Sequence, residues 1–342
     1  MIKEEKILQK KFRLSEFIIE QFIKLISFIS FAVIILIFLF VFREALPIFS
    51  QKENSAIREE LKTESYGEEP TVELSLPEST LEKKAEEKDE ATVKNLLGKE
   101  WQPVGLEPKY GLLPLFLGSL KVTFIALLFA APLSILAAIY SSLFANKRFK
   151  ELIKPAIELL SSFPSVVIGF FALVTLATFL QSFFGYTFRL NAFVGGLAMA
   201  IAVIPIIFTI TEDALSAVPK YFSEASLALG ASKWQTALFV VVPAATPGIF
   251  AALLLGFGRA FGETMIVLMA TGNAALSSLN PFDPVRTLSA TIGAEMAEVV
   301  FGDVHYSVLF FIGSLLFIIT FSLNAIAEFY VRAKLMKRFR GE

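Results

Sequence analysis

The sequence predicts an all-α integral membrane protein with six transmembrane helices, and its composition is the main reason. Hydrophobic residues make up 55% of the 342 residues, with 36 phenylalanines, and the mean hydropathy is +0.65. Charged residues make up 18%, against roughly 25% in soluble domains. They gather in residues 1–13, 51–100 and 332–342. The rest of the chain is too apolar for a soluble enzyme or a nucleic-acid-binding protein, and the absence of cysteine excludes a disulfide scaffold.

The six spans follow from apolar runs of sufficient length, because a helix needs about 20 apolar residues to cross a hydrocarbon core about 30 Å thick. The first run, residues 25–42, is too long for the core of a signal peptide, and no A-x-A-like cleavage site follows it. We therefore expect an uncleaved anchor. The other spans are expected near residues 115–144, 164–184, 192–211, 247–271 and 306–330.

The distribution of positive charge predicts the orientation of these spans. With six spans both termini lie on one side, and 17 lysines and arginines then fall on the side of the termini. The two short loops on the other side hold only Arg189 and Arg286. By the positive-inside rule, both termini are cytoplasmic and the protein is a multi-pass component of the cell (inner or plasma) membrane.

These spans divide the chain into five regions. They are a cytoplasmic tail (1–24), the first anchor (25–42), an extracytoplasmic segment (43–113), a five-helix core (114–331) with a cytoplasmic loop at 212–246, and a basic cytoplasmic tail (332–342). Residues 51–100 contain 14 acidic and 8 basic residues and few aromatic ones. Such a composition cannot bury a core, so we expect a disordered segment or a solvated helix. It is either a tolerated insertion or a docking surface for an outside partner.

The cytoplasmic loop carries a specific spacing. The run Glu224-Ala225-Ser226 is followed by three residues, Gly230, nine residues and the sequence Val-Val-Val-Pro that ends at Pro243. We read it as a short helix, a glycine turn, a second short helix and a proline stop. The pattern resembles the EAA loop of ABC importer permeases, with serine in place of the second alanine. The resemblance implies that Glu224, Ala225, Ser226, Gly230 and Pro243 dock onto a cytoplasmic ATPase; the alternative is an interfacial helix pair without a partner.

Any ATP hydrolysis is expected in a partner chain. A phosphate-binding loop needs G-x-x-x-x-G-K-[ST], and the one Gly-Lys pair, at residue 98, is followed by glutamate. We therefore expect this chain to bind no cofactor and to be no enzyme, with ATP and Mg²⁺ used by the ATPase. A single histidine, His305, cannot build a typical metal site and is expected at the surface or in a cap. Trp101 and Tyr110 are expected to anchor at the membrane interface, and Glu212 to be solvated.

A charged pair in the fifth span points to a solute path. Arg259 is the thirteenth residue of the expected span 247–271, and Glu263 follows four residues later. In a continuous helix the two lie about 40° apart, on a face with small residues such as Gly256, while Phe250, Phe257 and Phe261 face lipid. The pair is either a structural salt bridge or part of a path in which the guanidinium binds an oxyanion. Thr264 adds a hydroxyl, and Lys121, Ser161 and Ser162 are weaker candidates, since Lys121 can also snorkel.

Several stretches sharpen this hypothesis. Gly258–Met265 followed by Gly272-Asn273 resembles the signature of the membrane subunits of phosphate importers, closest to the C-type (PstC-like) permeases. Residues 110–120, 161–169 and 284–288 fit the same family. The resemblance implies the type I fold of binding-protein-dependent transport inner-membrane components, with Arg259 and Glu263 facing the translocation path. The implied partners are a homologous A-type permease in a heterodimer, two ATP-binding subunits, an extracytoplasmic phosphate-binding protein and membrane lipid, and no nucleic acid.

The function expected from this resemblance is the membrane path for inorganic phosphate in an ABC importer. Transport of another oxyanion, such as molybdate or sulfate, stays open, because an external binding protein can set selectivity. A membrane enzyme acting on lipid phosphates is disfavoured, since it needs a cluster of acidic residues and histidines at one membrane face. A receptor or scaffold that does not transport is a third alternative.

Overall fold

The computed structural model describes residues 14–49, 93–105 and 108–340. Within them, six helical segments are long and apolar enough to cross a membrane. These segments are Phe17–Ile48, Leu113–Phe144, Ser165–Phe184, Ala192–Ser216, Lys233–Phe261 and Val304–Phe329. The prediction of an all-α membrane protein with six spans is confirmed. The fifth span lies earlier in the chain than the expected 247–271, because its helix ends at Phe261.

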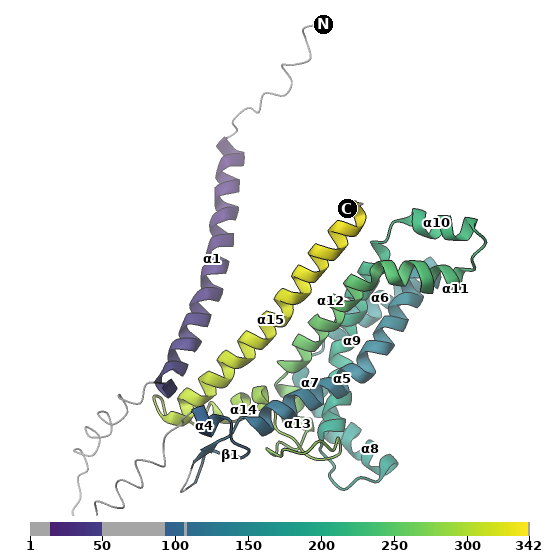
Figure 1. The fold of residues 1–342 in the computed structure, drawn as a ribbon. Coiled ribbons are helices and arrows are strands. Elements are labelled where there is room, and N and C mark those ends of the chain that lie inside the picture. The colour runs from purple at the N-terminus through teal and green to yellow at the C-terminus, as the bar shows by residue number, and fades with distance from the viewer. Residues whose placement is uncertain (1–13, 50–92, 106–107, 341–342) are drawn as a thin grey trace, which may run out of the picture.

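The elements follow one another almost without strands (Figure 1). The long helices are α1 (Leu14–Ala45), α5 (Leu113–Ile139), α6 (Lys147–Ser161), α9 (Ala192–Ser216), α12 (Val242–Phe261) and α15 (Val304–Arg340). The shorter helices are α4 (Val93–Leu96), α7 (Ser165–Phe171), α8 (Ala177–Phe184), α10 (Lys220–Ala228), α11 (Lys233–Thr236), α13 (Met265–Ala270) and α14 (Leu288–Glu295). A 3₁₀ turn covers Leu46–Phe49, and π-helical turns cover Tyr140–Phe144, Ala172–Leu176 and Ala237–Val241. Strands β1 (Trp101–Gln102) and β2 (Lys109–Tyr110) pair antiparallel, with Trp101 opposite Tyr110.

Helix α9 lies at the centre of the bundle, between α5 and α12. Glycines permit this close packing. A Cβ atom at Gly196 of α9 would lie 2.5 Å from Cγ2 of Ile125 on α5. A Cβ atom at Gly256 of α12 would lie 2.7 Å from Cγ1 of Ile207 on α9. Without a side chain at these two positions the helix backbones approach closely, which is how membrane helices gain packing energy.

The proline stop expected at Pro243 is wrong. The chain stays helical from α11 through the π-helical turn Ala237–Val241 into α12, so Pro243 sits inside one continuous span. The π-helical turn accommodates the proline, which has no N–H to donate. In it the Val242 N–H bonds to the carbonyl of Ala237, one residue further back than in an α-helix, so the hydrogen-bond register has already shifted before Pro243.

Helix α1 packs against α15 and is otherwise uncovered. The rings of Phe38 and Phe317 lie 4.9 Å apart, and those of Phe40 and Phe310 meet edge to face at 5.9 Å. No residue in the most apolar window of α1 is buried. The anchor thus presents nearly its whole surface to lipid or to another chain.

Helix α1 begins, and helix α15 ends, on the same side of the molecule (Figure 1). Residue 14, where α1 begins, and the end of α15 lie toward the side from which α10 and α11 project. This arrangement follows from an even number of spans and places the loop 212–246 on the side of the termini.

The charged segment 51–100 is described only from residue 93 onward, and its last residues do pack. Leu96 of α4 is buried, and its carbonyl accepts a hydrogen bond from the Leu112 N–H at 2.9 Å. Trp101 and Tyr110 are also buried, so they are not the interfacial anchors that the sequence suggested. The expectation that the whole of 51–100 is unable to pack is therefore wrong for its end, where apolar side chains return.

Candidate functional site

The fifth span is interrupted next to the predicted charged pair. Helix α12 ends at Phe261, and Gly262, Glu263 and Thr264 connect it to α13. Glycine is a poor helix former, and Gly258 and Gly262 lie in the last turn and at the cap. Glu263 thus follows the end of the helix, so the prediction that it shares a helical face with Arg259 is wrong. Within the described residues no ion pair joins the two; Arg259 is exposed and Glu263 is 9% exposed.

The predicted faces of this span are right in part. Ala252 and Gly256 are buried, as expected for the small face, and Phe250 is exposed, as expected for the opposite one. Phe261, however, is 2% exposed, stacks on Phe257 and meets Phe116 edge to face. The side of α12 that was expected to face lipid is covered here by α5, α14 and α15.

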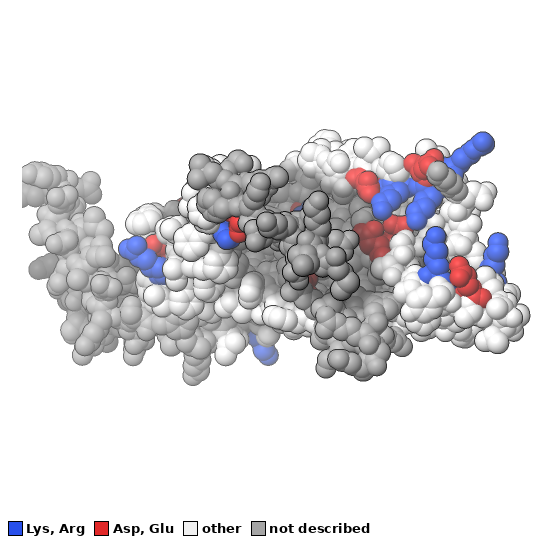
Figure 2. Space-filling model, turned by 90° about the horizontal axis from the view of Figure 1, so that it is seen from above, with Lys and Arg blue, Asp and Glu red and all other residues white. Residues whose placement is uncertain are grey.

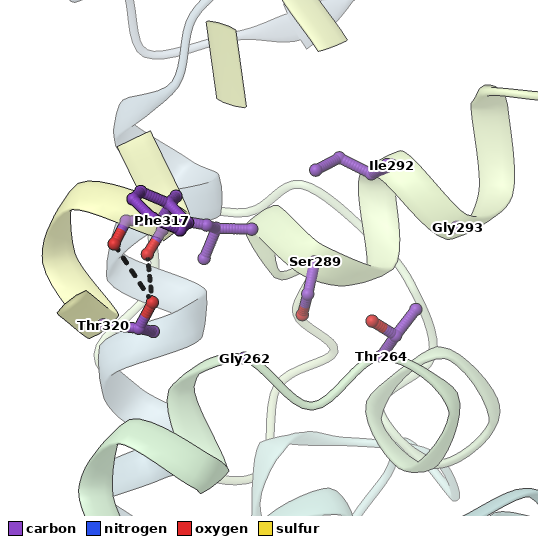
Figure 3. Close-up of a pocket in the computed structure, with 8 residues that line it drawn as sticks. Gly262, Thr264, Ser289, Ile292, Gly293, Phe317 and Thr320 are labelled. Carbon is purple, nitrogen blue, oxygen red and sulfur yellow. Dashed lines mark hydrogen bonds between the residues drawn. The ribbon is translucent and has the colours of Figure 1, made fainter. Parts of the chain in front are cut away.

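Thr264 lines a cavity of about 260 Å³ beside the interruption (Figure 3). The cavity is lined by Gly262, Thr264, Ser289, Ile292, Gly293, Leu316, Phe317 and Thr320. The hydroxyls of Thr264 and Ser289 point into the space between Gly262 and α14. The Thr320 hydroxyl is directed back to its own helix, where it donates to the carbonyl of Leu316 at 2.8 Å. The cavity is thus mostly apolar, with one hydroxyl, that of Thr264, beside the bent backbone and another, that of Ser289, on α14.

Helix α14 forms the opposite wall, and sequence reasoning missed it. The Ser289 Oγ donates to the carbonyl of Glu263 at 2.6 Å, which ties α14 to the interruption. The Leu288 N–H donates to Ser119 Oγ of α5 at 2.9 Å, and Thr287 caps the helix by accepting from the Ala290 N–H. The sequence signal was the threonine N-cap at 287 before an eight-residue helical stretch.

The stretches that resembled a transporter signature meet in space. A Cβ atom at Gly118 of α5 would lie 2.2 Å from the carbonyl oxygen of Arg286. One at Gly169 of α7 would lie 3.1 Å from the carbonyl oxygen of Met265. Gly272 and Asn273 both have positive φ, 78° and 51°, and turn the chain between α13 and the loop that leads to α14. Residues from five separate stretches therefore pack around one interruption.

The weaker candidates lie elsewhere. Lys121 Nζ donates to the carbonyls of Ser278 and Asn280 at 2.7 and 2.9 Å, so it holds the loop before α14. Ser161 Oγ donates to the carbonyl of Glu158 at the end of α6, and Ser162 is exposed beside it. None of these three residues lines the cavity.

A largely buried carboxylate, that of Glu295, lies near the start of α15. Glu295 accepts from Arg286 Nη1 at 2.6 Å and from Trp101 Nε1 at 3.1 Å, and its Oε2 lies 2.9 Å from His305 Nε2. Burial alone would raise the pKa of Glu295, but these hydrogen bonds and charges outweigh it and lower the pKa. His305 is buried in this cluster, so the surface or capping role predicted for it is wrong.

A second buried carboxylate lies at the opposite end of the bundle. Glu212 of α9 is 2% exposed and pairs with Lys150 at 2.6 Å and Lys154 at 3.0 Å, both on α6. The hydrogen bond from Lys154 raises the pKa of that lysine. The prediction of a solvated Glu212 is wrong, because α6 folds back over the end of α9. Figure 2 looks onto this end, where charged side chains gather on the side that holds α6, α10 and α11.

The predicted helix–turn–helix loop is present. Helix α10 carries Glu224, Ala225 and Ser226, Gly230 turns the chain with φ +86°, and α11 begins at Lys233. Ser226 and Thr236 join the two helices through their hydroxyls, 3.0 Å apart. No residue of α10 is buried, and Leu229 is 90% exposed. The loop is held by this contact and by Phe222, which packs against the core cluster at the end of α9, and most of its surface is exposed.

Comparison with known proteins places the chain among transport components. Residues 130–334 match the family model described as "Binding-protein-dependent transport system inner membrane component". The chain is 38% identical over 221 residues to a probable ABC transporter permease, YqgH, of Bacillus subtilis, covering 65% of this chain and 72% of that protein. It is 34% identical over 253 residues to the phosphate transport system permease PstC of Mesorhizobium japonicum, covering 68% and 76%. It is 32% identical over 244 residues to PstC of Haemophilus influenzae, covering 66% and 76%.

Proposed function

Because this chain belongs to the family of binding-protein-dependent transport system inner membrane components, we propose that it is a permease subunit that carries inorganic phosphate. The observation that carries the proposal is the 34% identity over 253 residues to a phosphate permease. The aligned part covers 68% of this chain and 76% of that relative, so the likeness extends well beyond a single motif.

The interrupted fifth span supplies the groups that a phosphate path needs. Arg259 lies in the last turn of α12 and is exposed. An arginine within the hydrocarbon core costs roughly 2.5–3.5 kcal/mol if it faces lipid, so we expect Arg259 to face water or a second permease subunit. Its fork of five N–H donors suits an oxyanion. Glu263 and the Thr264 hydroxyl follow at the break, where the backbone is no longer committed to a helix. One arginine beside a carboxylate binds an anion loosely enough to release it.

Energy for transport comes from a separate ATPase that binds ATP and Mg²⁺. The exposed helix α10, with Glu224, Ala225 and Ser226, is the docking surface, and Gly230 sets its angle to α11. Pro243 lies where the loop helix continues into α12, so movement of the loop is passed directly to the span that carries Arg259. The full machine contains two such ATPases, a homologous A-type permease and an external phosphate-binding protein.

In the orientation that suits this assembly, the chain crosses a bacterial-type cell membrane with both termini and α10 on the cytoplasmic side. Helix α14 and the two-stranded sheet then face outward, toward the phosphate-binding protein. The lysines of α6 lie on the cytoplasmic side, in accord with the positive-inside rule.

Uptake by the reconstituted complex tests the proposal. The chain is co-expressed with its A-type partner and ATPase, purified and placed in vesicles with the phosphate-binding protein. ATP-dependent uptake of labelled phosphate is expected, with excess unlabelled phosphate competing and equal sulfate or molybdate failing to compete. Competition by sulfate or molybdate at the same concentration would assign a different oxyanion, and absence of any ATP-dependent uptake would contradict a transport role.

A further inference from the structure

Glu295 ends α14 and gathers hydrogen bonds from three separate segments. Arg286 precedes α14, Trp101 belongs to β1 and His305 begins α15. Their nitrogens lie 2.6, 3.1 and 2.9 Å from the carboxylate oxygens, whose side chain is 12% exposed. A buried carboxylate is costly unless it is paired and hydrogen-bonded, so this set of donors holds the end of α14 in place.

Aromatic packing makes the cluster rigid. The His305 ring lies 6.0 Å from the Trp101 ring and 6.1 Å from the Tyr110 ring, and Trp101 and Tyr110 meet edge to face at 6.1 Å. All three rings are buried. The donors therefore cannot swing away from Glu295 without breaking ring contacts.

The cluster matters because of where α14 lies. The helix has only eight residues, too few to hold its own shape or position. Its first turn is held by Ser119 Oγ, which accepts from the Leu288 N–H, and its last residue is Glu295. Between these two anchors, Ser289 Oγ donates to the carbonyl of Glu263.

Gly293, two residues before Glu295, touches the proposed path residue Thr264. A Cβ atom at Gly293 would lie 2.6 Å from Thr264 Cγ2, so the α14 backbone lies directly against that side chain (Figure 3). No Cβ would fit between them, so the approach of the α14 backbone to Thr264 depends closely on the position of α14. Displacement of the end of α14 would open the cavity that Thr264 and Ser289 line.

We propose that Glu295 is a positioning residue for the interrupted fifth span. By gathering Arg286, Trp101 and His305 it fixes α14, and α14 in turn fixes the backbone of Glu263 and covers Thr264. The inference deepens the proposed function, since the residues it positions are those assigned to the phosphate path.

The absence of cysteine from the chain allows a direct test. Thr264→Cys places a single thiol beneath α14, and its rate of modification by a small methanethiosulfonate reagent reports how well α14 covers it. Adding Glu295→Gln in the assembled complex should speed modification by about tenfold, because loss of a hydrogen bond to a charged group shifts a local equilibrium by at least that factor. Glu298→Gln is the matched control: the same change at an exposed residue three positions along the chain should leave the rate unchanged.

Two milder variants keep the test decisive if Glu295→Gln does not assemble. Trp101→Phe keeps an aromatic ring and removes one donor to Glu295, and Ser289→Ala removes the bond to the Glu263 carbonyl. Each should raise the modification rate, Trp101→Phe by less than Glu295→Gln. Rates within twofold of the parent in every variant that assembles would overturn the proposal.

Phosphate uptake separates positioning from a structural role. In the chain that keeps Thr264, Glu295→Gln should raise the KM for phosphate per assembled complex severalfold. A residue that serves folding alone would lower the amount of complex and leave KM unchanged, and that outcome would also overturn the proposal. Because thiol modification needs no transport, a rate increase in a complex that takes up no phosphate would uphold the positioning role and contradict the phosphate path.

Discussion

Three largely buried carboxylates, Glu212, Glu263 and Glu295, show how single residues are satisfied in this protein. Glu212 is neutralised by two lysines of α6, and Glu295 by an arginine, a histidine and an indole N–H. Glu263 differs, since its described hydrogen bonds are made by its backbone: its N–H donates to the carbonyl of Ala260, and its carbonyl accepts from Ser289. Among the described residues, no hydrogen bond or ion pair is made by its carboxylate, and the proposed function assigns that group to the phosphate path.

At this scale the first prediction concerns Arg259. Since no ion pair to Glu263 holds it in the described chain, Arg259→Gln leaves no broken pair behind. We expect the thermal stability of the complex in detergent to change by less than about 0.5 kcal/mol, as for exposed positions. We expect phosphate uptake to fall at least tenfold, since a charge-assisted contact to the anion is lost.

Arg189→Gln serves as the control, because Arg189 caps the carbonyl of Leu173 at 2.7 Å, away from the cavity. That variant should transport normally. Normal uptake by Arg259→Gln would instead show that the arginine lies outside the path.

A second prediction concerns acid and Glu295. Its pKa is lowered in the folded protein, so its contribution to stability is complete above the unfolded value, about 4.3, and is lost as the pH falls through the folded value. At neutral pH, Glu295→Gln should destabilise by about 1.5–3 kcal/mol, the value of hydrogen bonds to a charged group. The difference in Tm between the two proteins should shrink below about pH 4.3. A difference that is constant from pH 7 to pH 3 would contradict the assignment.

At the scale of elements, the helices divide into those held by the bundle and those held by their own local contacts. Helices α5, α9 and α12 approach through glycines, and α14 is held by side chains at both ends. Helix α10 has no buried residue; it is held by Phe222, which packs against the core cluster at the end of α9, by the Ser226–Thr236 contact and by the turn at Gly230. An element held so lightly is suited to take its final position from a partner.

The third prediction uses this turn. Gly230 has φ +86° with open space around it, so Gly230→Val strains the backbone without a clash, at a cost of roughly 1–3 kcal/mol. The turn between α10 and α11 should open, and co-purification with the ATPase should be lost while the six spans stay inserted.

Gly302→Val is a matched control, because Gly302 also has a positive φ, +82°, and open space, but lies in the loop before α15. It should keep the ATPase. Equal ATPase recovery with both variants would contradict docking through α10.

At the scale of the whole molecule, the bundle from α5 to α15 is one packed body to which α1 adds a single contact surface. The family match begins at residue 130, within α5, so α1 and the charged segment lie outside it. Packing resumes at α4, where Leu96 is buried beside Trp101 and Leu112. The packed part of the described chain thus extends back from α5 at least to α4.

The fourth prediction compares a deletion outside the described residues with a deletion inside this packed part. Deletion of residues 60–85 removes charged chain that lies outside the described residues and should leave assembly and uptake unchanged. Deletion of residues 93–100 removes the buried Leu96, whose carbonyl accepts from the Leu112 N–H, and should lower the recovery of the assembled complex. If the first deletion abolished assembly, the segment would be a required docking surface rather than an insertion.

The number of spans, the helical class and the helix–turn–helix of the loop could all be predicted from the amino-acid sequence. Each of these depends on local signals: apolar length, and a glycine where φ must be positive. Family membership could also be anticipated, since it depends on short motifs such as residues 258–265. None of these predictions needs knowledge of which helices are neighbours in the folded protein.

The distribution of charge in space, by contrast, became visible in the folded chain alone. The distance along the chain from Trp101 to Glu295, or from Lys150 to Glu212, holds no information about contact, so both buried clusters were misread as surface features. The break at Gly262 was also missed, because an apolar run looks the same whether its helix continues or stops. The place of α14 against Thr264 depends on anchors from α5, β1 and α15, and only the folded chain brings them together.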